Sequence, residues 1–141
     1  MHKTSNEVKQ FISEINGLTI NERVQAIVCS PFPYLHMLTE AVKGMDVQIA
    51  AQNMHYETSG AFTGEVSPTM LQDIGVSHVI IGHSERRQYF NETDETVNQK
   101  VIAAHQHQLT PIVCVGESLE QREADETFTH IESQVTKALK D

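Results

Sequence analysis

Hydrophobic positions along the chain follow two alternating patterns. Short, nearly continuous apolar runs rich in valine and isoleucine are typical of buried strands, and they cover residues 24–29, 46–53, 79–81 and 109–115. Between these runs, apolar residues recur every three or four positions, which is the spacing of one face of a helix. The order predicted from the two patterns is α-β-α-β-α-β-α-β-α.

Polar residues and glycines place the helix ends. Thr4 to Glu7 and Ser118 to Gln121 have the form of capping boxes, in which two side chains satisfy free backbone amides. Ser67-Pro68 is suited to open a helix, since proline at the first position loses no bond that the helix needs. The apolar positions expected on single helix faces are Val8, Phe11, Ile12 and Ile15; Leu35, Leu38 and Val42; Val97, Val101 and Ala104; and Phe128, Ile131, Val135 and Leu139.

The alternation of strands and helices predicts the fold class. Strands without a polar face, each followed by a helix, favour an α/β fold with a parallel sheet and right-handed crossovers. No linker or low-complexity segment divides the chain, so residues 1–141 are expected to form a single domain. About four parallel strands fit either a small open sheet or half of an eight-stranded barrel.

Composition narrows the classes of function. With 39% hydrophobic and 21% charged residues, the chain is globular rather than disordered. Its formal net charge of -9 disfavours a nucleic-acid partner. No apolar run approaches the roughly 20 residues that span a membrane, so no membrane partner is expected. The N-terminal residues lack an apolar core, so a signal peptide is not expected there.

The two cysteines, Cys29 and Cys114, both lie in apolar runs. This setting predicts buried thiols rather than a disulfide or a metal site, and therefore a reducing compartment, with the cytoplasm as the expected location.

His83 is the first candidate for chemistry. It follows the apolar run Val79–Ile81 and Gly82, and a polar segment rich in helix formers begins directly after it. This places the imidazole at the carboxyl end of a strand, where ligands bind in α/β proteins. The free amides at the start of a helix disfavour protonation of an adjacent ring. The alternative is a structural histidine at a strand end.

Several ordered stretches resemble triosephosphate isomerase. They are AQNMH (51–55), GAFTGEVSP (60–68), IGHSERR (81–87), ETDETVN (92–98) and PIVCVGES (111–118). The resemblance covers essentially the whole chain, and it matches the second to fifth βα units of the family's protein. It implies a (β/α)8 TIM barrel of which this chain supplies an incomplete part with about four strands.

The resemblance also implies an activity. Members of the family interconvert dihydroxyacetone phosphate and D-glyceraldehyde 3-phosphate through an enediolate, in glycolysis and gluconeogenesis, without a cofactor or metal. A glutamate moves the proton while a neutral histidine polarises the carbonyl oxygen, for which this family is the established example. A cytoplasmic homodimer acting on a small triose phosphate is the expected assembly.

The residues of the IGHSERR stretch take the family's site roles. His83 matches the electrophilic histidine. Glu85 matches a glutamate that supports the site by pairing with a lysine expected before Met1, and the alternative is a carboxylate that complements the helix dipole. For Ser84, a helix cap and a contact to the catalytic pair remain equally open. Arg86 and Arg87, with Glu92 and Asp94, resemble a basic anion clamp, but they are expected instead to form structural ion pairs that hold the helix after His83.

Five further residues follow from the resemblance. Cys114 matches a cysteine near the catalytic glutamate, although a plain core role accounts for it equally well. Thr63 lies in a long loop that resembles the dimer-forming loop, with an ordinary exposed threonine as the alternative. Gln52 and Asn53 are expected to support that interface. Gln108 stands where the family commonly has a glycine, which predicts a strained left-handed turn.

The general-base glutamate and the phosphate loops of the family are expected after Asp141. The 141-residue chain alone is therefore expected to be close to inactive, because loss of a general base typically costs on the order of 10²–10⁴-fold. The alternative is a non-catalytic half-barrel that a second chain completes, since four parallel strands leave two open edges. A different phosphate-handling enzyme is disfavoured, because no glycine-rich phosphate loop precedes a helix.

Overall fold

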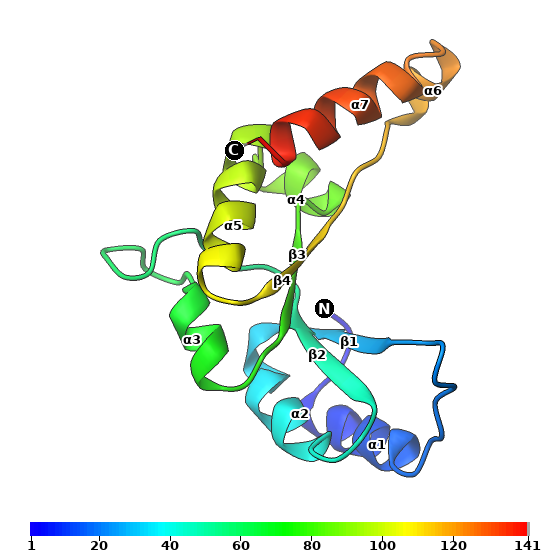
Figure 1. The fold of residues 1–141 in the computed structure, drawn as a ribbon, viewed down its shortest axis with the longest axis vertical. Coiled ribbons are helices and arrows are strands. Elements are labelled where there is room, and N and C mark those ends of the chain that lie inside the picture. The colour runs from blue at the N-terminus through cyan, green and yellow to red at the C-terminus, as the bar shows by residue number, and fades with distance from the viewer. Residues whose placement is uncertain (141) are drawn as a thin grey trace.

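Four parallel strands form one sheet in the order of the sequence (Figure 1). The computed structural model describes residues 1–140. The strands are β1 (Ala26–Ser30), β2 (Val47–Ala51), β3 (His78–Ile81) and β4 (Thr110–Val113). Ala26 pairs with Val47, Ala50 with His78, and His78 with Thr110. The α/β class and the parallel sheet are thus confirmed, and the sheet is not closed within the described residues.

Helices connect the strands where the patterns predict them. They are α1 (Ser5–Ile15), the 3-10 helix η1 (Phe32–Tyr34), α2 (Leu35–Ala41), α3 (Pro68–Asp73), α4 (Ser84–Tyr89), α5 (Asp94–Gln106), α6 (Leu119–Glu123) and α7 (Thr127–Ala138). Capping boxes open α1 and α6, and Pro68 is the first residue of α3. The capping box at Ser118 opens a short helix that is separate from α7. Asp125, between the two helices, takes a left-handed φ of 56°, which interrupts the helical backbone.

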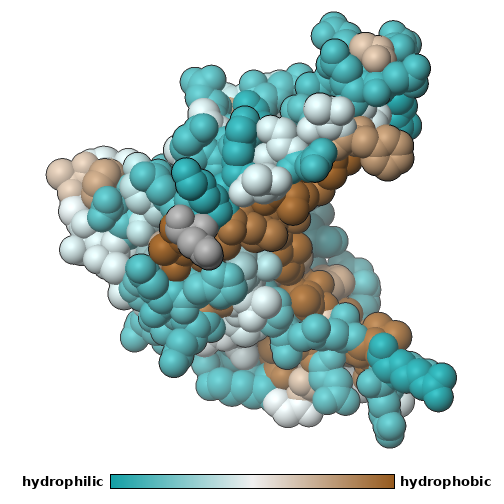
Figure 2. All heavy atoms as spheres, turned by 45° about the horizontal axis from the view of Figure 1, so that its top comes forward, coloured by the Kyte–Doolittle hydropathy of each residue, from teal (hydrophilic) through white to brown (hydrophobic). Residues whose placement is uncertain are grey.

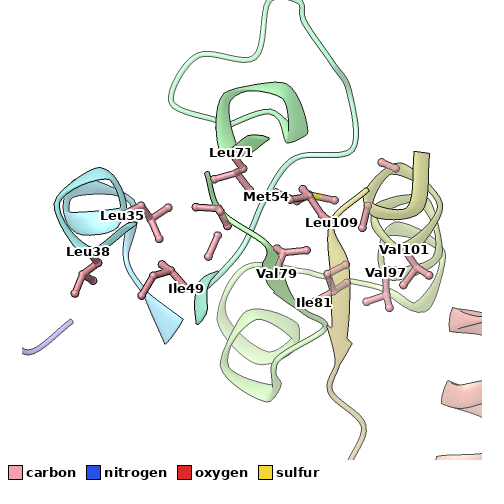
Figure 3. Packing of buried hydrophobic residues seen from close by; sticks show 14 of the residues in the cluster. Leu35, Leu38, Ile49, Met54, Leu71, Val79, Ile81, Val97, Val101 and Leu109 are labelled. Carbon is pink, nitrogen blue, oxygen red and sulfur yellow. The ribbon is translucent and has the colours of Figure 1, made fainter. Parts of the chain in front are cut away.

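The core lies between the sheet and the helices α2, α3 and α5 (Figure 3). Leu35 and Leu38 of α2 face Ile49 of β2, while Val97 and Val101 of α5 lie beside Ile81 of β3. Burial of these side chains is the main force that holds the helices on the sheet, at roughly 1.5–3 kcal/mol for each fully buried large side chain.

The two edge strands are less buried than the two central ones. Every residue of β1 except Ser30 is half-buried, and so are three of the four residues of β4. The prediction of two buried thiols is therefore only partly correct, because Cys29 and Cys114 are free cysteines that are half-buried. Helices α2, α3 and α5 cover one face of the sheet (Figure 3). Hydrophobic surface remains visible in the recess of the molecule (Figure 2).

Helix α7 presents its apolar stripe outward. Phe128 is 90% exposed and Leu139 58%, although their spacing predicts a buried face. The buried residues of α7 are instead Gln134 and Ala138, since the helix packs on α5. The amide of Asn98 on α5 donates to the carbonyl oxygen of Ala138 at 3.1 Å. Docking on α5 thus decides which side is covered: Ile131 is half-buried, whereas Phe128, Val135 and Leu139 stay exposed within residues 1–140.

Gln108 adopts the left-handed conformation that the sequence predicts, with φ 55°. Such a conformation costs a residue with a Cβ roughly 1–2 kcal/mol, part of which is offset by the greater freedom of glycine in the unfolded chain. We expect Gln108→Gly to raise the free energy of unfolding by about 0.5–1 kcal/mol in urea denaturation. Gln99→Gly, at an exposed position inside α5, is the matched control and should lower it.

No helix among residues 1–140 combines the length and the apolar character needed to cross a bilayer.

Candidate functional site

The site is built on the turn between β3 and α4. Gly82 takes φ 78°, in the left-handed region that favours glycine. A Cβ at this position would lie 3.0 Å from Val97 Cγ2, 3.1 Å from Arg87 Nη2 and 3.2 Å from the Cys114 carbonyl oxygen. The sequence therefore needs glycine here, both for conformation and for space, and this turn brings the next residue to the carboxyl edge of the sheet.

His83 is the N-cap of α4, and its side chain closes the first turn. Its Nδ1 atom accepts a hydrogen bond from the Glu85 backbone N–H at 3.3 Å. A ring nitrogen that accepts carries no proton, so the neutral ring carries its proton on Nε2. The Glu85 carboxylate lies 3.9 Å from the same Nδ1, too far for a hydrogen bond. The geometry leaves an Nε2–H donor on a side chain that is 44% exposed.

Charged side chains hold this turn, as the sequence predicts for Arg86, Arg87 and their acidic partners. Glu92 Oε1 accepts from the Gly82 N–H at 3.2 Å, and Glu92 Oε2 accepts from Arg86 Nε at 2.7 Å. Arg87 Nε donates to the Gly82 carbonyl at 2.9 Å, and Arg87 Nη1 donates to Asp94 Oδ1 at 2.7 Å. These residues contact the backbone around His83, and they form a support rather than an anion clamp.

Lys100 belongs to this support, although sequence reasoning did not single it out. Its Nζ lies 3.2 Å from Glu92 Oε1 and donates to Asn53 Oδ1 at 2.8 Å. The side chain is only 8% exposed. The helical spacing of the apolar residues could have indicated this role. Lys100 shares the inward face of α5 with Val97 and Val101, where a charge needs a buried partner.

Burial and pairing act in opposite directions on this buried pair. Burial raises the pKa of the Glu92 carboxyl, but Lys100 and Arg86 outweigh it and hold that pKa below its usual value. For Lys100, burial lowers the pKa of the ammonium and the attraction of Glu92 offsets only part of the effect.

A hollow of about 670 Å³ opens beside the His83 ring. It brings together Gln52, Asn53, His83 and Glu85, which the sequence singled out from separate segments. Its other walls are largely apolar and include Phe32, Ile80, Tyr89 and Phe90. Tyr89 and Phe90 are 67% and 63% exposed, so their rings extend the hollow to the surface.

The remaining predicted residues do not line this hollow. Ser84 is exposed, and His83 rather than Ser84 is the cap of α4. Cys114 follows β4, where its N–H donates to the Ile81 carbonyl at 2.8 Å. Burial raises the pKa of its thiol, with a smaller opposing effect from Arg87.

Thr63 is exposed in the loop of residues 55–66. The loop is closed by a hydrogen bond from the His55 N–H to the Val66 carbonyl at 2.8 Å. Inside it, the His55 ring lies 4.4 Å from the rings of both Tyr56 and Phe62. The loop therefore has a small aromatic core of its own, which presents Thr63 on a defined surface.

The described residues contain no group of three or more histidine, cysteine, aspartate or glutamate side chains placed to hold a metal ion. This edge of the sheet offers the imidazole Nε2–H of His83 as a donor beside a largely apolar hollow. Such a donor stabilises negative charge that develops on a carbonyl oxygen.

Comparison with known families agrees with the architecture. The model of the family described as triosephosphate isomerase matches residues 1–141. The match includes the four parallel βα units and the turn that carries His83. The chain therefore belongs to the triosephosphate isomerase family.

Proposed function

We propose that this chain carries the electrophilic half of an aldose–ketose isomerase site that acts on dihydroxyacetone phosphate and D-glyceraldehyde 3-phosphate. The observation that supports this role best is the Glu85 N–H on His83 Nδ1, which leaves Nε2–H as a donor toward a substrate carbonyl. A neutral donor polarises the carbonyl of either triose without transferring its proton prematurely. The free thiols of Cys29 and Cys114 are compatible with a cytoplasmic location.

Glu85 is proposed to support His83 rather than to move the substrate proton. Its carboxylate lies on the Nδ1 side of the ring, at 3.9 Å, whereas the proposed donor to substrate is Nε2. A general base must reach the substrate carbon from hydrogen-bond distance. Among the described residues that line the hollow, Glu85 is the one acidic side chain, and its position on the Nδ1 side does not suit it for that transfer.

The 141-residue chain alone is therefore expected to isomerise D-glyceraldehyde 3-phosphate at least about 10²–10⁴-fold more slowly than an enzyme with its base in place. A coupled assay of the purified chain measures this rate. An enzyme-like rate that His83→Gln abolishes would support the role of His83 but overturn the expected inactivity. An enzyme-like rate that survives His83→Gln would overturn the proposed site.

Substrate contact with His83 is tested independently of turnover. In ¹H–¹⁵N spectra of the imidazole rings, titration with dihydroxyacetone phosphate is expected to shift the His83 Nε2 resonance. The buried ring of His78, whose Nδ1 lies 2.8 Å from Ser77 Oγ, provides the internal control. A shift of both rings, or of neither at saturating ligand, would contradict the proposal.

We further propose that the chain forms a homodimer through the loop of residues 55–66, which enters the hollow of the partner. The hollow is lined by Gln52, Asn53 and Glu85, and the exposed rings of Tyr89 and Phe90 flank it. Exposed aromatic rings beside polar groups are typical of interface centres. The self-packed loop would enter without a large ordering cost.

Thr63→Arg is expected to convert the dimer to a monomer, because the much larger side chain would overpack the contact between the loop and the hollow. Thr19→Arg, at another exposed loop threonine, is the control and should leave the mass unchanged. Light scattering after size-exclusion chromatography measures both. A dimer that persists in Thr63→Arg would show that another surface joins the copies.

The alternative function, a half-barrel that a second chain completes, has an observation of its own. Such a chain would cover the free edges of β1 and β4, at opposite ends of the sheet, and the outward residues of α7, where Phe128 is 90% exposed. Phe128→Glu distinguishes the two assemblies. It should abolish association through the α7 stripe and leave association through the loop intact.

A further inference from the structure

Two charged side chains hold the backbone on both sides of Gly82, the residue before His83. Glu92 accepts from the Gly82 N–H at 3.2 Å, and Arg87 Nε donates to the Gly82 carbonyl at 2.9 Å. That carbonyl belongs to the same peptide group as the His83 nitrogen. The plane of the Gly82–His83 peptide is therefore set by Arg87.

This restraint matters because glycine itself restricts the backbone conformation very little. Gly82 lies in the left-handed region with φ 78°, but glycine visits many other conformations at low cost. The bond from the Glu85 N–H to His83 Nδ1 depends on the backbone angles of His83, φ -56° and ψ 141°. A peptide plane that rotates at Gly82 would move the ring off that donor.

Arg87 is itself held firmly. Its Nη1 donates to Asp94 Oδ1 at 2.7 Å, and its side chain is 17% exposed. Its Nη2 is buried and has no hydrogen-bond partner within the described part of the chain. A guanidinium reaches two acceptors at once through its rigid fork, whereas an ammonium acts from a single point.

We propose that Arg87 is a positioning residue for His83: by holding the Gly82 carbonyl, it keeps His83 Nδ1 on the Glu85 N–H and the ring proton on Nε2. The effect on catalysis rests on the proposed role of His83 as the electrophile. The effect on the ring is independent of that role, since it concerns only the tautomer and orientation of His83 in the free protein.

Two substitutions separate this role from a merely structural one. Arg87→Gln removes the charge but keeps an N–H donor at the position of Nε along the side chain. Arg87→Lys keeps the charge but puts a methylene group at that position. The proposal predicts that Arg87→Gln retains the single Nε2–H tautomer, whereas Arg87→Lys loses it and shows a mixture of Nδ1–H and Nε2–H forms.

Imidazole ¹H–¹⁵N spectra of the 141-residue chain measure the tautomer directly. Arg122→Gln, which removes an exposed partner of Glu117, is the control and should leave His83 unchanged. His107, whose Nδ1 lies 2.8 Å from the Ala103 carbonyl, serves as a reference ring in every variant. Either variant alone, if it folds, can overturn the proposal. An unchanged His83 tautomer in Arg87→Lys would do so, and so would a mixture of His83 tautomers in Arg87→Gln.

The outcome is distinguishable from that of the proposed function. If dihydroxyacetone phosphate does not shift His83 but the Arg87 variants behave as predicted, the positioning role stands and the assigned substrate is wrong. If the ligand shifts His83 and both Arg87 variants keep the wild-type tautomer, the substrate assignment stands and Arg87 has only a structural role.

Discussion

Gly82→Ala is expected to lower the free energy of unfolding by about 2–5 kcal/mol, the sum of two costs. A left-handed backbone costs a residue with a Cβ roughly 1–2 kcal/mol. Overpacking typically costs a further 1–3 kcal/mol, and the new methyl would lie 3.0 Å from Val97 Cγ2 and 3.2 Å from the Cys114 carbonyl oxygen. Urea denaturation followed by circular dichroism measures the loss.

Two other glycines separate these costs. Gly44 has φ 84° and open space around it, so Gly44→Ala should show only the conformational cost. Gly116 has neither a left-handed φ nor a neighbour within 4 Å of an added Cβ, so Gly116→Ala should be close to neutral. A Gly82→Ala loss no larger than that of Gly44→Ala would mean that the packing around the turn is loose.

Glu92→Gln is expected to destabilise the protein by about 3–5 kcal/mol, because removal of one partner of a buried ion pair leaves the other charge without compensation. The Glu92 side chain is 2% exposed and pairs with Lys100 and Arg86 at 3.2 and 2.7 Å. Glutamine fills the same volume and can still accept from the Gly82 N–H. The loss therefore reports the charge rather than the packing, and thermal or urea unfolding at neutral pH measures it.

The control is an ion pair of similar length on the surface. Glu40 and Lys43 lie 2.7 Å apart but are 52% and 69% exposed, and such pairs contribute little in water. Glu40→Gln should leave the unfolding midpoint unchanged within error. Equal effects of Glu40→Gln and Glu92→Gln would show that the Glu92 cluster is not protected from solvent.

The same pair predicts a dependence on pH. The pKa of Glu92 is lowered in the folded protein, so the unfolded state binds the proton more readily. The stabilisation is complete above the ordinary value of 4.5 and is lost as the pH falls through the lowered pKa. Between neutral pH and pH values below that range, the wild type should lose more stability than Glu92→Gln. Parallel pH profiles of the two proteins would contradict this assignment.

Local sequence determined most of the framework. The apolar runs and the helical spacing predict the order of strands and helices. The period of the apolar positions and the β-branching of the side chains both act over only a few residues. The capping boxes at Thr4 and Ser118, Pro68 at the start of α3, and the left-handed Gln108 are likewise local. The position of His83 after Gly82 follows from the same kind of signal, since the strand, the turn and the helix are contiguous.

Contacts between distant segments were decided only by the tertiary structure. Lys100 is a partner of Glu92 and Asn53 because α5 packs on β3 and β4, which brings its side chain to the residues that follow β2. No pattern within α5 predicts those partners. The His83 tautomer follows from one hydrogen bond to the Glu85 N–H, whose geometry depends on a peptide plane held by Arg87.

Burial was the property that sequence predicted least well. Phe128, Val135 and Leu139 have the spacing of a buried face, but α7 docks on α5 through Gln134 and Ala138. The sequence by itself determined which residues are apolar and which element each belongs to. Whether another element covers them depends on how helices and strands pack across the whole sheet, since hydrophobic burial is non-directional and only the assembled fold determines which surfaces meet.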